Sequence, residues 1–133
     1  MKRALLLFCL LLASNAGAQT SPRLPETDKV RRLLLSAIDA KDGTAEAWLT
    51  GAMAQRLKNE TKAPANSRVR ISISTLQVFR PGCKRLRMLL AIPSHQMKTV
   101  RGTMEMFQMY YDLNLCRDGR PPHDSNVGRE ATP

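Results

Sequence analysis

The chain has 133 residues, with 21 Lys and Arg against 11 Asp and Glu, so it is strongly basic and has room for one modest domain. It contains no C-x-x-C, H-E-x-x-H or D-x-D pattern and no phosphate-binding glycine loop, which excludes the common metal-site and nucleotide-binding motifs. We therefore expect no metal, no other cofactor and no enzymatic activity.

The N-terminal residues have the three parts of a secretory signal peptide. Lys2 and Arg3 precede an apolar run over 4–13, which is followed by the small-residue triplet Ala16-Gly17-Ala18. A membrane anchor is the alternative, but a helix of about ten residues at ~1.5 Å each is too short for a bilayer core of ~30 Å. We expect cleavage after Ala18, a periplasmic or secreted product, and a formal charge lowered from +10 to +8.

Two amphipathic helices are predicted at the start of a single domain over 27–116, behind an extended lead-in over 19–26. The first helix begins near Thr27 and ends at Asp42-Gly43-Thr44, and its apolar positions recur at helical spacing: Val30, Leu33, Leu34, Ala37 and Ile38. The second helix follows Thr44 as its N-cap, with an apolar stripe of Ala45, Trp48, Leu49, Ala52, Met53 and Leu57. Together they predict a helical hairpin.

Three strands are predicted after the linker at 62–67, because apolar residues there alternate with period two. The first strand carries Val69, Ile71 and Ile73, and then Leu76 and Val78 after a phase slip that predicts a β-bulge near Ser74 or Thr75. The inward residues of the second are Leu86, Met88, Leu90 and Ile92, and those of the third are Phe107, Met109, Tyr111, Leu113 and Leu115. The predicted fold is α+β, a helical hairpin packed on a three-stranded antiparallel meander, with a disordered tail over 117–133.

Cys83 and Cys116 are the two cysteines that remain after export, and an oxidising compartment favours a disulfide between them over a catalytic thiol. If they face each other in an antiparallel pair, partner numbers sum to 199, and Leu86 meets Leu113. Every inward residue then meets an inward residue. Since a slip of one would turn a whole face into water, the disulfide and the apolar pattern predict the same register.

A basic segment lies between Glu60 and Glu105, where no acidic residue occurs. Four of its arginines are predicted on the outward side of the first two strands as an unpaired cationic face: Arg68, Arg70, Arg85 and Arg87. This face is interpreted either as a site for an anionic partner, such as an acidic protein patch, lipid headgroups or polysaccharide, or as a solvated face that keeps sheet edges from pairing. Export argues against nucleic acid as the partner.

Met104, Met106 and Tyr110 lie on the outward side of the third strand and predict an exposed apolar strip. Strips of this kind mark protein contacts. The alternative is that the lead-in around Leu24 or the loop around Val100 covers them.

The closing stretch Leu115-Cys116-Arg117-Asp118-Gly119-Arg120-Pro121-Pro122 ends a short basic domain that follows an export signal. In this layout the second half of the chain resembles small exported accessory proteins encoded among conjugative transfer and type IV secretion genes of Gram-negative bacteria. The resemblance implies a periplasmic, non-enzymatic part of a transfer apparatus or of its regulation, and it assigns no functional residue.

These features predict a periplasmic binding or assembly factor that docks on an envelope protein through the arginine face and the apolar strip. The alternative is a polyanion or membrane-surface binder that acts through charge alone. An enzyme is the third interpretation, and it would require His95 close to Asp112 or Glu105.

Overall fold

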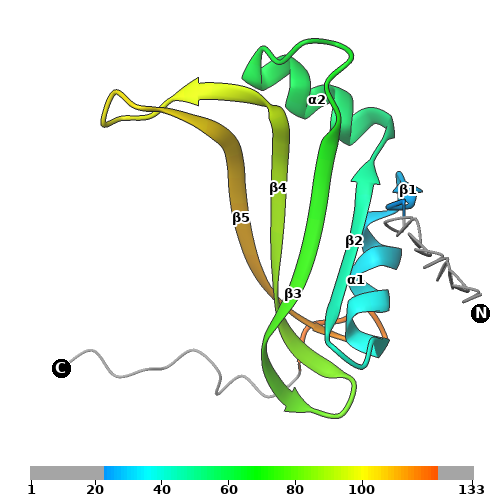
Figure 1. Ribbon diagram of the computed structural model, residues 1–133. Coiled ribbons are helices and arrows are strands. Elements are labelled where there is room, and N and C mark those ends of the chain that lie inside the picture. Colours follow the sequence, from blue (N-terminus) through cyan, green and yellow to red (C-terminus); the bar gives the residue numbers. More distant parts are fainter. Residues whose placement is uncertain (1–22, 123–133) are drawn as a thin grey trace, which may run out of the picture.

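The protein is described here by a computed structural model over residues 23–122 (Figure 1). Five strands form one sheet in the order β1-β2-β3-β4-β5, and the elements follow one another as β1 (Glu26–Thr27), α1 (Val30–Asp39), β2 (Thr44–Leu49), α2 (Gly51–Thr61), β3 (Val69–Arg80), β4 (Cys83–Lys98) and β5 (Met104–Cys116). The predicted signal peptide, the first half of the lead-in and the end of the tail lie outside the described residues. Between residues 23 and 122, neither helix combines the length and apolarity needed to cross a bilayer.

The predicted α+β class with two helices is confirmed, but the predicted helical hairpin, with its second helix from Thr44, is wrong because a strand separates the two helices. Residues Thr44–Leu49 form β2, which pairs antiparallel with β3, and the helix begins only at Gly51. Ala45, Ala47 and Leu49 alternate as well as recurring at helical spacing, so the segment fits a half-buried strand equally well. Pairing with the long strand β3 decides in favour of the strand.

The three-stranded sheet is also wrong in its strand number, because the predicted lead-in contributes a strand. Glu26–Thr27 forms β1, which pairs parallel with β2 and places Glu26 opposite Trp48. The backbone N–H of Trp48 donates to the carbonyl of Pro25 at 2.8 Å. Helix α1 therefore starts at Val30, after this short strand, and not near Thr27.

The antiparallel meander itself is present as β3-β4-β5, with the predicted register between β4 and β5. Cys83 lies opposite Cys116, their Cα atoms are 3.9 Å apart, and the two form a disulfide. Leu86 lies opposite Leu113 as predicted. The covalent link and the apolar pattern thus select one alignment of these strands.

The predicted bulge in β3 is present one residue further along, between Thr75 and Gln77. It shifts the phase of the strand, so that Val78 lies opposite Lys84 on the same side of the sheet as Leu86. Val78 nevertheless remains 58% exposed. The bulge therefore turns Val78 toward the core-facing side without burying it.

The core lies between α1 and one side of the sheet, which we call the inner face; the opposite side is the outer face. Helix α1 packs against β2, β3 and β4, and α2 adds Ala54 and Leu57 to the same core. The largest fully buried side chains all lie on the inner face of two strands, β3 and β4: Ile71, Ile73, Leu86, Ile92 and Val69. The inner face of β5 is less well covered, because Tyr111 is 47% exposed.

The far end of the β4–β5 hairpin bends away from the rest of the sheet (Figure 1). The register shifts between Ile92 and Gln96, where β4 has extra residues that β5 lacks. At this bend the Nε2 atom of His95 lies 2.9 Å from the carbonyl oxygen of Thr61, at the end of α2. We call the projecting part, residues 96–106, the hairpin arm.

The chain continues in a defined turn beyond Cys116, where the disordered tail was predicted to begin. The backbone N–H of Cys116 donates to Arg120, and that of Gly119 donates to Cys116. Arg117 forms an ion pair with Asp39 of α1 at 2.6 Å. The turn therefore belongs to the domain, while residues 123–133 lie outside the described residues.

Candidate docking surface

The arginines predicted to face outward lie on the outer face, but most of them have carboxylate partners. The Arg70 guanidinium donates to both carboxylate oxygens of Glu46, at 3.0 and 2.8 Å. Arg87 donates to both oxygens of Asp112, at 2.8 and 2.9 Å. The predicted face is thus basic but not unpaired.

Arg68 precedes β3 and has two partners on the neighbouring strands. Its guanidinium lies 2.9 Å from a carboxylate oxygen of Glu26 and 4.3 Å from the centroid of the Trp48 ring. Arg85 differs from the other three, because it forms no ion pair with any residue in the described range 23–122. It lies near enough to Asp112 to stabilise that carboxylate electrostatically.

The Arg87–Asp112 pair perturbs both groups. The hydrogen bond from Arg87 is the main cause that lowers the pKa of Asp112, and Arg85 adds to the effect. The pKa of Arg87 is raised in turn, first by its hydrogen bond with Asp112. Arg87 also lies 5.7 Å from the centroid of the Tyr110 ring, so this pair forms one border of the apolar strip.

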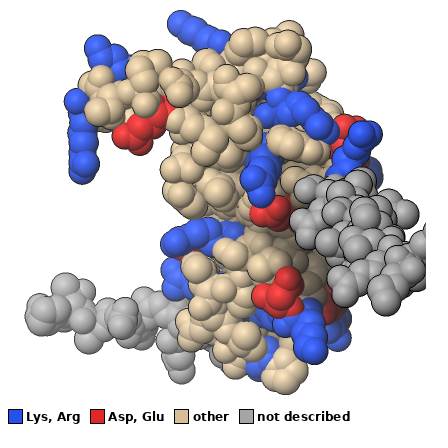
Figure 2. Space-filling model, in the orientation of Figure 1, with Lys and Arg blue, Asp and Glu red and all other residues tan. Residues whose placement is uncertain are grey.

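Basic side chains are spread over the surface in separate groups with carboxylates near them, as Figure 2 shows for one face. The arginines of β3 and β4 also lie on interior strands of the sheet. They cannot protect sheet edges, so this interpretation of the arginine face is wrong.

Met104, Met106 and Tyr110 form the predicted strip on the outer side of β5. They are 59%, 41% and 54% exposed. Val100, in the loop predicted as a cover, is fully exposed. Within residues 23–122 nothing buries the strip, and it runs from the hairpin arm down to the Arg87–Asp112 pair.

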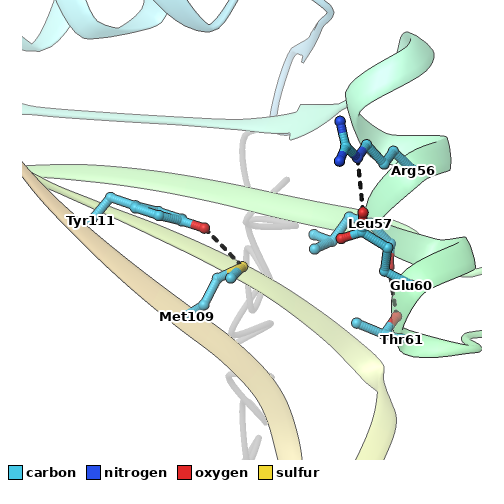
Figure 3. Close-up of polar contacts among 6 residues, drawn as sticks. All are labelled: Arg56, Leu57, Glu60, Thr61, Met109 and Tyr111. Atoms are coloured by element: carbon cyan, nitrogen blue, oxygen red, sulfur yellow. Dashed lines mark hydrogen bonds and ion pairs between the residues drawn. The ribbon is translucent and has the colours of Figure 1, made fainter.

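An apolar groove on the inner face was not predicted from the sequence. It has a volume of about 320 Å³ and lies between α2 and the β4–β5 hairpin, lined by Met53, Arg56, Leu57, Glu60, Leu90, Met109 and Tyr111. Figure 3 shows Met109 and Tyr111 on the side of the sheet toward α2, with the Tyr111 hydroxyl 3.8 Å from the Met109 sulfur. Its apolar lining residues were each predicted to face inward, but nothing in the sequence predicted that they would leave a groove between α2 and the hairpin.

The rim of the groove is polar. Arg56 and Glu60, one helical turn apart on α2, form an ion pair with an N–O distance of 2.8 Å, and this hydrogen bond raises the pKa of Arg56. The pair and its groove lie on the opposite side of the sheet from the strip.

A second depression lies on the outer face. Its volume is about 400 Å³, and it is lined by Trp48, Pro64, Asn66, Ser67, Arg68, Pro93 and Ser94. The guanidinium of Arg68 stacks on Trp48 and is held by Glu26, so its charge is already partly compensated. The depression adds an aromatic wall to the basic part of the surface.

His95 and the two carboxylates considered as its alternative partners in an enzyme, Asp112 and Glu105, each have a different partner. His95 contacts the Thr61 carbonyl, Asp112 binds Arg87, and Glu105 accepts a hydrogen bond from Thr103. Because a carbonyl oxygen only accepts, Nε2 of His95 must carry the proton. In the described part of the chain no three His, Cys, Asp or Glu side chains are grouped as metal ligands.

Comparison of this chain with protein-family models, with curated proteins and with solved structures found no match.

Proposed function

We propose that the protein is a non-enzymatic binding or assembly factor that acts outside the cytoplasm and docks on an envelope protein through the strip of Met104, Met106 and Tyr110. The observation that carries the proposal is the exposure of all three side chains, at 59%, 41% and 54%. A contiguous exposed apolar surface rimmed by polar residues is typical of a protein contact. Arg87, whose guanidinium lies 5.7 Å from the centroid of the Tyr110 ring, supplies part of the polar rim.

The arrangement of the charges supports an apolar contact over a purely electrostatic one. Arg68, Arg70 and Arg87 each lie within 3.0 Å of a carboxylate oxygen, so three of the four positive charges are locally compensated. A polyanion or membrane-surface binder, the alternative, would use unpaired cations. Arg85 is the member of the set best placed to serve it.

The setting of this function is supported by the disulfide and by the resemblance. A disulfide between Cys83 and Cys116 is consistent with a location outside the cytoplasm. The closing motif Leu115–Pro122 supports an accessory role in a conjugative transfer or type IV secretion apparatus. Both the cleaved signal peptide and this apparatus are parts of the proposal.

The proposal is tested by capture from envelope extract with the oxidised protein and two matched variants. Met104→Ser/Met106→Ser removes most of the strip, whereas Val78→Ser removes an exposed apolar side chain elsewhere. Burial of two methionines contributes about 3 kcal/mol, so the double variant should bind the captured protein roughly 100-fold more weakly. Val78→Ser should bind like the wild type.

Salt separates the two candidate functions. The Debye length falls from ~10 Å at 0.1 M salt to ~3 Å at 1 M salt, which weakens charge-driven binding. Binding through burial of the apolar strip persists at high salt. Capture that resists salt and depends on the methionines supports docking through the strip. Recovery of lipid, polysaccharide or nucleic acid alone, lost as salt rises and unaffected by the double variant, would instead support the polyanion binder.

A further inference from the structure

The strand β5 forms one edge of the sheet along its full length. The order of strands places β4 on one side of β5 and no described strand on the other. The strand has 13 residues, whereas β1 at the opposite edge has 2. Unpaired backbone N–H and C=O groups of a long edge strand are a template for another strand.

The hydrogen bonds fix which residues of β5 face this free edge. The N–H of Arg117 donates to the carbonyl of Gly82 at 2.7 Å, so these opposite residues are a hydrogen-bonded pair. In an antiparallel ladder such pairs alternate with non-bonded ones. Odd-numbered residues of β5, including Met109 and Tyr111, therefore direct their backbone groups to β4.

Even-numbered residues direct theirs away from β4. On the sheet side of the bend these residues are Gln108, Tyr110, Asp112 and Asn114. In the hairpin arm the register differs, but the N–H of Thr99 donates to the carbonyl of Thr103, so odd-numbered residues again face β4 and even-numbered ones face away. On the sheet side of the bend, the edge from Gln108 to Asn114 thus presents a regular row of donors and acceptors. The side chains of the same residues lie on the outer face.

This edge lacks the features by which sheets avoid pairing. Natural edge strands carry lysine, proline or a bulge. The sequence Met104–Cys116 has no Lys, Arg or Pro, and the irregularity of this hairpin lies in β4. Its two charges are Glu105 and Asp112, and Arg87 compensates the latter.

The chain's own continuation is a poor occupant of the edge. The Cys116 N–H is already bonded to Arg120, and the chain has reversed direction there. Pro121 and Pro122 follow, and a proline cannot donate the hydrogen bond that a returning strand would need opposite Asn114. Among residues 23–122 no segment occupies the edge, which is therefore available to a separate chain.

We propose that a second copy of this chain adds its β5 antiparallel to this edge, across a two-fold axis perpendicular to the sheet. The two strands then bond through their even-numbered residues, so partner numbers in the pairing have an even sum. Glu105 and Asp112 sum to an odd number and can never lie opposite each other in such a register. Self-pairing near the middle of β5 therefore places no acidic residue opposite another acidic residue. The two-fold axis limits the assembly to two copies, as expected of an isologous dimer.

The second copy completes both apolar surfaces of the molecule. The two inner faces lie on the same side of a continuous sheet, so Met109 and Tyr111 of each groove lie beside their equivalents. Tyr111, which is 47% exposed, gains apolar neighbours. On the outer face the two strips of Met104, Met106 and Tyr110 lie side by side.

The test compares Gln108→Pro with Gln108→Thr in the full oxidised chain, by sedimentation velocity at several concentrations. Proline at 108 removes an N–H that points away from β4, so the bonds within the sheet are kept, whereas threonine retains the N–H. The wild type and Gln108→Thr should be dimers, and Gln108→Pro should be a monomer. Gln108→Lys, which places an edge-protecting lysine at the same position, gives the same test if the proline variant does not fold.

Amide hydrogen exchange shows whether the dimer uses this edge. In the wild type the amides of Tyr110 and Asp112 should be protected, and in Gln108→Pro they should exchange rapidly, while Met109 and Tyr111 remain protected by β4. A wild-type monomer at all concentrations, a dimer unaffected by either substitution, or open-ended assemblies would each overturn the proposal. Docking through the strip is judged separately by Met104→Ser/Met106→Ser, because Gln108→Pro removes a backbone donor of the edge and keeps all three side chains of the strip.

Discussion

Arg87 and Asp112 show how one ion pair reduces the net charge that a basic surface presents. The two residues are 25 positions apart in the sequence and lie opposite each other on β4 and β5. Their ion pair has an N–O distance of 2.8 Å and converts one of the outward cations into a compensated pair. Glu46 does the same for Arg70 from the neighbouring strand β2.

Substitution of Arg87 by glutamine should raise the pKa of Asp112 toward its ordinary value, because the hydrogen bond that lowers it is lost. Carbon NMR titration of the Asp112 carboxyl measures the change. Arg56→Gln is the control, since Arg56 binds Glu60 on the other side of the sheet. An Asp112 pKa that is the same in Arg87→Gln and in the wild type would contradict the pairing.

The pH dependence has a defined sign. The pKa of Asp112 is lower in the folded protein than in the unfolded chain, so the pair stabilises the fold above about pH 4 and loses this effect as the pH falls. The difference in unfolding free energy between the wild type and Arg87→Gln should therefore shrink on acidification, as measured by urea unfolding.

Gly43 has a structural role that no other residue can fill. Its φ is +69°, and an added Cβ would lie 2.6 Å from the Thr75 hydroxyl oxygen. We expect Gly43→Ala to cost roughly 1–3 kcal/mol of unfolding free energy, from backbone strain and from this clash. Gly102→Ala is the control, because its φ is +85° but its nearest neighbour is 3.9 Å away. Equal losses in the two variants would exclude the clash.

At the scale of elements, β3 organises the domain. It is an interior strand that pairs with both β2 and β4. Its first half is buried at Val69, Ile71 and Ile73, while its second half, beyond the bulge, is mostly exposed. The strand therefore contributes to stability mainly through the half that lies beneath α1.

Two substitutions in β3 measure this asymmetry. Ile71→Val deletes one methylene from a fully buried side chain and should cost about 0.5–1.5 kcal/mol. Val78→Ala deletes more, but from a side chain that is 58% exposed, and should cost less than about 0.5 kcal/mol. Urea unfolding of both variants provides the comparison. A larger loss for Val78→Ala would mean that the second half of β3 is covered in solution.

At the scale of the whole molecule, the disulfide joins the start of β4 to the end of β5. Cys83 and Cys116 are 33 positions apart, so their bond closes the entire hairpin, including the arm. The disulfide therefore holds the edge strand β5 in register with β4.

Removal of the disulfide should lower the unfolding free energy by about 3–4 kcal/mol, the value expected for a loop of this length. Urea unfolding of Cys83→Ser/Cys116→Ser and of the reduced wild type should give similar midpoints, both below that of the oxidised protein. Mass spectrometry of the protein isolated from its native host should find no free thiol at Cys83 or Cys116. Two free thiols there would remove the support for the register.

The sequence alone determined the parts of this protein that depend on local pattern. Period-two alternation identified β3, β4 and β5, and the spacing of Cys83 and Cys116 added their register, because both depend on which side chains must be buried together. The exposed positions of Met104, Met106 and Tyr110 followed from the same alternation. These features needed no knowledge of distant segments.

Only the tertiary structure decided the rest. Residues Thr44–Leu49 satisfy helical and strand spacing alike, and their pairing with β3 selects the strand. The short strand Glu26–Thr27 has no stability of its own and exists because β2 lies beside it. The carboxylate partners of the arginines and the free edge of β5 likewise depend on strand order, a property of long-range pairing that local periodicity does not encode.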